Sequence, residues 1–226
     1  MKLRLPLALV LVEIVAVWVV SDVGYYQLLS LLGIGSSYST HPFVLGAYYL
    51  GWAGVALFIF WPLYQRWKTI DVRASMFVTT IATSILAAFY LFYVLPMFPP
   101  IHWAHAWRPP TELLTASGWY FLPKSIEIVL QQLLVAAMVL AFEVRKFSLR
   151  AISLWSAVLF GGIHLLMVLD GSSPAYVAIF TASAVAAGLL FPYLMLRIKN
   201  GFIYSYFIHW GFYAVVVVLS RMFFTA

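Results

Sequence analysis

The amino-acid sequence predicts an all-α protein, a polytopic bundle of about seven transmembrane helices that forms one domain over residues 1–226. Two observations carry this prediction. Of the 226 residues, 65% are hydrophobic and 9% are charged, whereas a soluble domain has about 25% charged residues. The apolar runs are also long and unalternating, which fits helical spans of about 20 residues better than the strands of a membrane barrel. The chain is therefore expected to be an integral membrane protein.

Seven apolar stretches are long enough to cross a bilayer. They lie at residues 5–21, 43–64, 76–98, 124–142, 151–170, 174–196 and 202–222. The first exceeds the roughly 7–15 apolar residues of a signal-peptide core, and no small-residue cleavage site follows it, so we interpret it as a span. Residues 22–42 are expected to form an interfacial loop. Residues 99–123, rich in Pro, Trp and His, are expected to form the longest connection.

The positive charges alternate between the connections. Ten of the thirteen Lys and Arg residues lie in the N-terminal segment and in 65–75, 143–150 and 197–201. The remaining three are Arg108, Lys124 and Arg221. Because cytoplasmic loops are enriched in Lys and Arg, this pattern predicts a cell-membrane protein with a cytoplasmic N-terminus and an external C-terminus. The net charge of +6 lies in these connections, so it indicates membrane lipid and not nucleic acid as a partner.

Small residues predict which spans pack most closely. Membrane helices approach one another where both offer small side chains. Span 151–170 contains Gly161 and Gly162, and span 174–196 contains Ala184 and Gly188 four residues apart. These two spans are expected to form the tight centre of the bundle.

Three ionisable residues lie inside the apolar sequence of the C-terminal half: Glu127, His164 and His209. Such groups are costly in lipid and usually line a site. Gln131 lies on the same helix face as Glu127, four residues on, and Lys124 lies one turn before it. Glu127 is therefore either a base that faces an internal cavity or a boundary carboxylate paired with Lys124.

The two histidines have polar or aromatic neighbours at helical spacing. Phe160 lies one turn before His164, and Tyr213 one turn after His209. Each histidine alone could be a hydrogen-bonding link between helices. Together with Glu127 they could supply a base, a proton carrier and an oxyanion donor around one water. Two histidines, a glutamate and a water also form a known zinc set, although chemistry without a cofactor is favoured here. With no cysteine, a zinc–thiolate site is excluded.

Residues 124–218 resemble the catalytic core of the CAAX-protease and bacteriocin-processing (CPBP, or Abi) family of intramembrane glutamic proteases. The family pattern is a glutamate pair followed by xxxR, then FxxxH, then HxxxN. The chain has Glu127-Ile-Val-Leu-Gln-Gln132, Phe160-Gly-Gly-Ile-His164 and His209-Trp-Gly-Phe-Tyr213 in this order. The helix rich in small residues and the short basic turn between the histidines also match.

The resemblance implies an intramembrane endopeptidase that cleaves a membrane-associated peptide or protein near the membrane surface. It assigns water activation to Glu127, assistance to His164 and the oxyanion to His209 with Tyr213. Phe160, Gln131 and Gln132 are expected to support these groups. The chain departs from the family as a divergent member, because Ile128, Gln132 and Tyr213 replace the second glutamate, the arginine and the asparagine. Losing the glutamate and the arginine together leaves no unpaired buried charge.

Two other functions stay open. Ile128 and Gln132 are compatible with a non-catalytic relative that binds a protein or lipid partner. Glu13, in the middle of the first span, would suit a small proton-linked transporter or redox-linked subunit. His102 and His105 are interpreted as interface packing and Asp170 as a turn residue.

Convergence of Glu127 with the two histidines sets a condition on the helices. In the spans given above, Glu127 and His164 lie in the outer half of the bilayer, whereas His209 is only about 11 Å from the cytoplasmic end of its span. The three can meet only if helices tilt or if the fourth span begins earlier, near Trp119. We favour the earlier start, which also places Glu127 deeper.

Overall fold

The computed structural model describes residues 6–33, 38–67, 73–101, 113, 116–169 and 171–223, and these form helices with no strand among them. Seven long helices follow one another: α1 (Leu7–Leu32), α2 (Pro42–Tyr64), α3 (Arg73–Phe89), α4 (Phe121–Glu143), α5 (Leu149–His164), α6 (Pro174–Arg197) and α7 (Gly201–Phe223). Seven segments of the described chain are long and apolar enough to cross a membrane. The predicted all-α transmembrane bundle is confirmed.

Short irregular turns extend three of the spans. A π-helical turn (Tyr90–Val94) and a 3₁₀ turn (Leu95–Met97) continue α3, where Pro96 lacks the N–H needed for an α-helical bond. A 3₁₀ turn over Leu165–Val168 continues α5. Another, Gly118–Tyr120, precedes α4. The fourth span therefore begins before residue 124, at the earlier start that the sequence analysis favours.

The predicted interfacial loop over 22–42 is wrong for residues 22–32, because α1 continues to Leu32. The polar residues expected to end the helix are accommodated within it. The Ser21 hydroxyl donates to the Trp18 carbonyl (2.7 Å), and the Tyr48 hydroxyl of α2 donates to the Ser21 carbonyl (2.7 Å). Such local bonds satisfy a serine inside a helix without breaking it.

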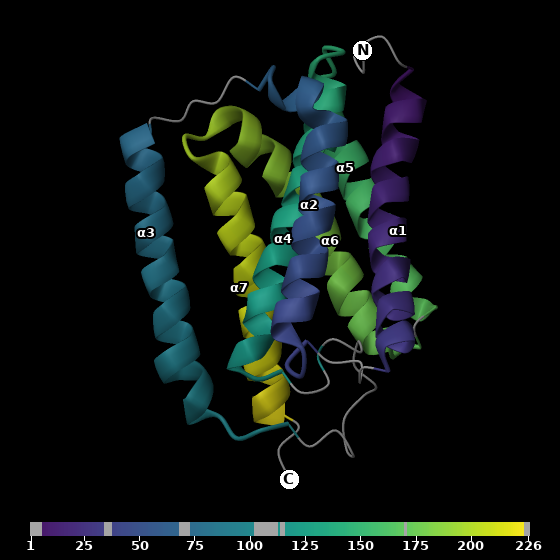
Figure 1. Cartoon of the computed structure of the whole chain (residues 1–226). Coiled ribbons are helices and arrows are strands. Elements are labelled where there is room, and N and C mark those ends of the chain that lie inside the picture. The colour runs from purple at the N-terminus through teal and green to yellow at the C-terminus, as the bar shows by residue number, and fades with distance from the viewer. Residues whose placement is uncertain are drawn as a thin grey trace.

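The centre of the bundle is α4, not the pair α5 and α6 that the small residues predict. In the most apolar part of the α4 span 78% of residues are buried, against 28% for α5 and 33% for α6. Figure 1 shows α4 enclosed by its neighbours, with the start of α1 and the end of α7 at opposite ends of the bundle. The close packing of α5 on α6 is nevertheless present. A Cβ at Gly188 would lie 2.5 Å from Ala157 Cα.

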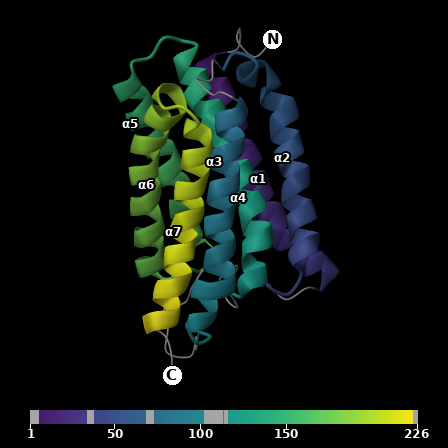
Figure 2. The ribbon, with the colours of Figure 1, turned by 90° about the vertical axis from the view of Figure 1, so that its left-hand side faces the viewer.

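Helix α3 lies at the periphery, beside α7 (Figures 1 and 2). Only 6% of the residues in the most apolar part of this span are buried. Asn200 donates to Ser75 (2.8 Å) and Thr79 (3.0 Å) near one end, and the Tyr90 hydroxyl donates to the Ala214 carbonyl (2.9 Å) near the other. Hydrogen bonds at both ends therefore attach α3 to α7.

We predict that Gly188→Ala lowers the free energy of unfolding by about 2 kcal/mol, because the added methyl group meets the α5 backbone and overpacks the contact. Gly162→Ala is the matched control, since a Cβ there has no neighbour within 4 Å. Unfolding of both variants in mixed detergent micelles measures the difference. Equal stability of Gly188→Ala and the wild type would contradict the close approach of α5 and α6.

Candidate functional site

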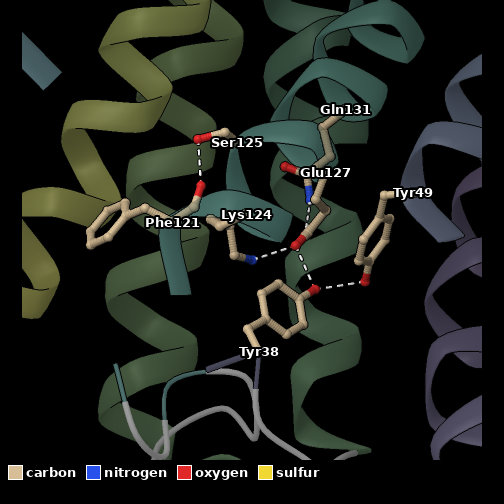
Figure 3. Close-up of polar contacts among 7 residues, drawn as sticks. All are labelled: Tyr38, Tyr49, Phe121, Lys124, Ser125, Glu127 and Gln131. Atoms are coloured by element: carbon tan, nitrogen blue, oxygen red, sulfur yellow. Dashed lines mark hydrogen bonds and ion pairs between the residues drawn. The ribbon is translucent and has the colours of Figure 1, made fainter. Parts of the chain in front are cut away.

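Glu127 lies inside the bundle, and three donors occupy its carboxylate (Figure 3). Lys124 Nζ lies 2.7 Å from Oε2, and the Tyr38 hydroxyl donates to the same oxygen at 2.6 Å. Gln131 Nε2 donates to Oε1 at 2.7 Å, one helical turn further along α4. The Tyr49 hydroxyl of α2 lies 2.7 Å from that of Tyr38. Glu127 is thus buried inside the bundle and paired with Lys124.

Lys124 is buried as deeply as its partner, with 1% of its surface exposed. Its ammonium group lies 4.3 Å from the centre of the Tyr213 ring, 5.0 Å from that of Tyr38 and 5.9 Å from that of Tyr120. Aromatic ring faces attract a cation, most strongly where water is excluded. The glutamate and the three tyrosines together offset the cost of burying this charge.

Gln132 faces a different side of α4 from Glu127. Five residues of α-helix rotate a side chain by about 140° and advance it by about 7.5 Å. Gln132 accordingly reaches α7, where its Nε2 lies 3.3 Å from both the Ser205 carbonyl oxygen and His209 Nδ1. The Ser205 hydroxyl lies 3.2 Å from Gln132 Oε1. Gln132 therefore links the central helix to His209.

His164 and His209 line one pocket between α5, α6 and α7, with a volume of about 260 Å³. Its walls are mostly small or apolar: Phe160, Phe180, Ser183, Ala184, Ala186, Ala187, Leu190, Phe191, Ile208 and Phe212. No charged side chain is among these lining residues. The pocket therefore suits an uncharged group.

The Phe160 ring lies between the two histidines. Its centre is 5.0 Å from that of the His164 ring and 5.8 Å from that of the His209 ring, both edge-to-face. The Phe160 carbonyl oxygen lies 2.8 Å from His164 Nδ1, one turn along α5. The Trp18 ring of α1 also packs on Phe160, with the two ring centres 5.4 Å apart. The FxxxH spacing thus positions the ring and the imidazole together.

Tyr213 connects the pocket to the buried ion pair. Its ring is nearly parallel to that of His209, with the centres 5.6 Å apart and an interplanar angle of 25°. The same ring lies against the Lys124 ammonium group. A chain of contacts therefore runs from Glu127 through Lys124 and Tyr213 to His209.

The structure divides the predicted site residues into two neighbouring groups. Phe160, His164 and His209 line the pocket. Gln132 is not a lining residue but contacts His209 Nδ1. Glu127, Gln131 and Tyr213 are not among the residues that line the pocket. In the described part of the chain, no three His, Cys, Asp or Glu side chains are placed to share a metal ion.

The remaining candidates are Glu13 on α1 and three residues outside the described chain. Glu13 is half-buried on α1. His102, His105 and Asp170 fall outside the residues that the structure describes.

Sequence reasoning named Tyr213 but missed the other tyrosines around the ion pair, Tyr38, Tyr49 and Tyr120. Tyr38 belongs to a segment expected to be an interfacial loop, and Tyr49 and Tyr120 lie on other elements. Contacts between residues so far apart in the chain leave no periodic pattern in a single sequence, so they could not be predicted from spacing. The i, i+3 spacing of Lys124 and Glu127 did indicate their pairing, though not its burial.

Comparisons with known proteins found no match: no family model, no curated protein and no solved structure is significantly similar to the chain. The three motifs and their order remain the basis of the family resemblance.

We predict that Lys124→Met lowers the free energy of unfolding by about 3–5 kcal/mol, because it leaves the Glu127 carboxylate buried without its cation. The double variant Lys124→Met/Glu127→Gln removes both charges and is expected to lose less than the sum of the two single variants. Unfolding of all four proteins in detergent gives the coupling energy. Strictly additive losses would contradict a buried, coupled pair.

Proposed function

We propose that the chain is an intramembrane endopeptidase of the CPBP type, acting on a membrane-associated peptide or protein. One observation supports this most: residues from all three motif segments meet at His209. Gln132 of the first motif lies 3.3 Å from its Nδ1, Phe160 of the second packs on its ring, and Tyr213 of the third is stacked against it.

The proposed chemistry needs a water, a carbonyl and the groups already described, without a metal. The Glu127 carboxylate removes a proton from water, whose oxygen attacks the peptide carbonyl carbon. A ring N–H of His209 donates to the oxyanion that forms. The C–N bond then breaks, and the proton passes to the leaving amine.

One local rearrangement has to precede this step. Both Glu127 oxygens already accept hydrogen bonds, and the carboxylate is not part of the pocket lining. Tyr38 lies outside the long helices, just before α2, so its hydroxyl is the donor that a small backbone movement would remove. Substrate binding is proposed to displace Tyr38 and admit water to Oε2.

The same occupancy of Glu127 favours a second candidate function. A carboxylate held by Lys124, Tyr38 and Gln131 can act purely as a structural link between the helices. The histidine pocket would then bind an uncharged segment of a membrane partner without cleaving it.

We also propose the orientation that the charges indicate. Arg66, Arg145, Lys146, Arg150 and Lys199 lie in or next to the turns α2–α3, α4–α5 and α6–α7. Figure 1 shows the end of α2 and the start of α3, together with the α4–α5 and α6–α7 turns, at the end of the bundle where α1 begins. That end is proposed to face the cytoplasm of a cell membrane.

We predict that cells expressing the chain gain new N-termini in their membrane proteins, and that Glu127→Gln and His164→Gln remove them. The measurement is mass spectrometry of labelled N-termini from purified membranes. Glu143→Gln is the matched control, because Glu143 is exposed at the far end of the same helix. Lys124→Met/Glu127→Gln controls for damage from an unpaired lysine.

The outcomes separate the two candidate functions. If both His164→Gln and Glu127→Gln lose the new N-termini while Glu143→Gln keeps them, hydrolysis by this site is supported. New N-termini that persist in Glu127→Gln would overturn the assignment of the base. Their absence even with the wild-type chain would overturn the endopeptidase and leave the binding function.

A further inference from the structure

The Ser205 carbonyl sets the orientation of the Gln132 amide. One end of the amide lies 3.3 Å from this carbonyl oxygen. The other end lies 3.2 Å from the Ser205 hydroxyl, which also donates to the Phe202 carbonyl oxygen at 2.8 Å. A backbone carbonyl only accepts hydrogen bonds, so the end facing it must be the NH₂ group. Reversing the amide would place two carbonyl oxygens against each other. The Gln132 nitrogen is therefore fixed on the side of His209.

This orientation determines the protonation of His209. The same Gln132 Nε2 lies 3.3 Å from His209 Nδ1, and an amide nitrogen only donates. Nδ1 must then be the unprotonated acceptor, since a proton there would face another N–H. His209 is thus a neutral imidazole with its proton on Nε2.

His164 has the opposite arrangement. Its Nδ1 lies 2.8 Å from the Phe160 carbonyl oxygen, which only accepts. Nδ1 therefore carries a proton. The apolar walls of the pocket favour an uncharged ring, and an uncharged His164 has its lone pair on Nε2. In each ring Nδ1 is already bonded within the protein. Both rings line the pocket, so Nε2 is the ring nitrogen that remains for a ligand.

We propose that the pocket recognises a secondary amide through a matched pair of ring nitrogens: His209 Nε2–H donates to its carbonyl and His164 Nε2 accepts from its N–H. Gln132 is the positioning residue that sets this polarity. The choice of a peptide amide as ligand rests on the proposed function, whereas the assignment of the two ring protons does not. The apolar walls suit the uncharged amide and disfavour a carboxylate.

The size of the pocket fits the same ligand class. Its volume of about 260 Å³ is just below the roughly 300–1,000 Å³ of sites for drug-sized ligands. Alanines 184, 186 and 187 of α6 leave one wall shallow, and Phe180, Phe191 and Phe212 supply apolar contact. One amide with short apolar flanks therefore fits where a bulky headgroup does not.

Nitrogen-15 NMR of the full chain with labelled histidine tests the ring protons, because protonated and unprotonated ring nitrogens resonate far apart. His164→Gln and His209→Gln assign the signals. We expect His209 with an unprotonated Nδ1 and a protonated Nε2, and His164 with the reverse. The same tautomer in both rings, or a proton on His209 Nδ1, would overturn the proposal.

Substitution at Gln132 separates positioning from mere packing. In Gln132→Glu a carboxylate of the same shape faces Nδ1, so we expect the His209 proton to move to Nδ1 or the ring to gain a second proton. Leu130→Met is the control, because Leu130 is a buried apolar residue two positions earlier, on nearly the opposite face of α4, and should leave the His209 signals unchanged. Gln132→Met removes the donor and should leave His209 a mixture of both tautomers. An unchanged His209 spectrum in both Gln132 variants would overturn the role of this residue.

Two simple amides test the ligand class on the same sample. N-butylpentanamide should shift the Nε2 signals of both histidines, whereas its N-methylated analogue, which lacks the N–H, should shift only that of His209. Identical effects of the two amides, or none, would overturn amide recognition. A response to pentanol alone would overturn it in favour of a lipid hydroxyl. None of these readouts involves cleavage, so they can succeed even if the endopeptidase proposal fails.

Discussion

The buried ion pair between Lys124 and Glu127 is the constraint around which this bundle is arranged. Two charges inside lipid-spanning helices are tolerated only if protein groups replace their hydration. Here the replacement comes from Gln131 on the same helix and from two distant parts of the chain, Tyr38 before α2 and Tyr213 on α7. This requirement explains why α4 is the most buried helix, since its polar residues must all face protein.

Much of the fold could be predicted because lipid imposes simple rules on sequence. The long apolar runs predicted all seven spans, and most predicted ends lie within a few residues of those in the structure. The rules failed where a polar residue did not end a helix, as at Ser21, whose side chain bonds within the helix. They failed again for the bundle centre, because small residues report close contact between two helices and not enclosure by many. Gly188 packs tightly on α5, yet α4 lies in the middle.

The candidate site could be predicted only in part, for a related reason. Helical spacing brought Phe160 to His164 and Lys124 to Glu127, since both pairs lie within one turn. The neighbour that each face of α4 contacts depends on tertiary packing, which the spacing within one helix does not predict. Gln132 therefore approaches His209, while Glu127, five residues earlier, lies among tyrosines. The result is two adjoining networks, a charged one around Glu127 and Lys124 and an uncharged one around the histidine pocket.

The shared pocket of His164 and His209 is the central claim of this account, and cross-linking tests it most directly. The chain has no native cysteine, so cysteines placed at 164 and 209 report on this pair alone in intact membranes. We expect a short bifunctional reagent to join them efficiently. A pair at 143 and 164 is the negative control, since α5 separates these positions by about 22 Å along its axis. Failure of the 164/209 pair to link, with both cysteines still reactive toward a single-ended reagent, would contradict the shared pocket.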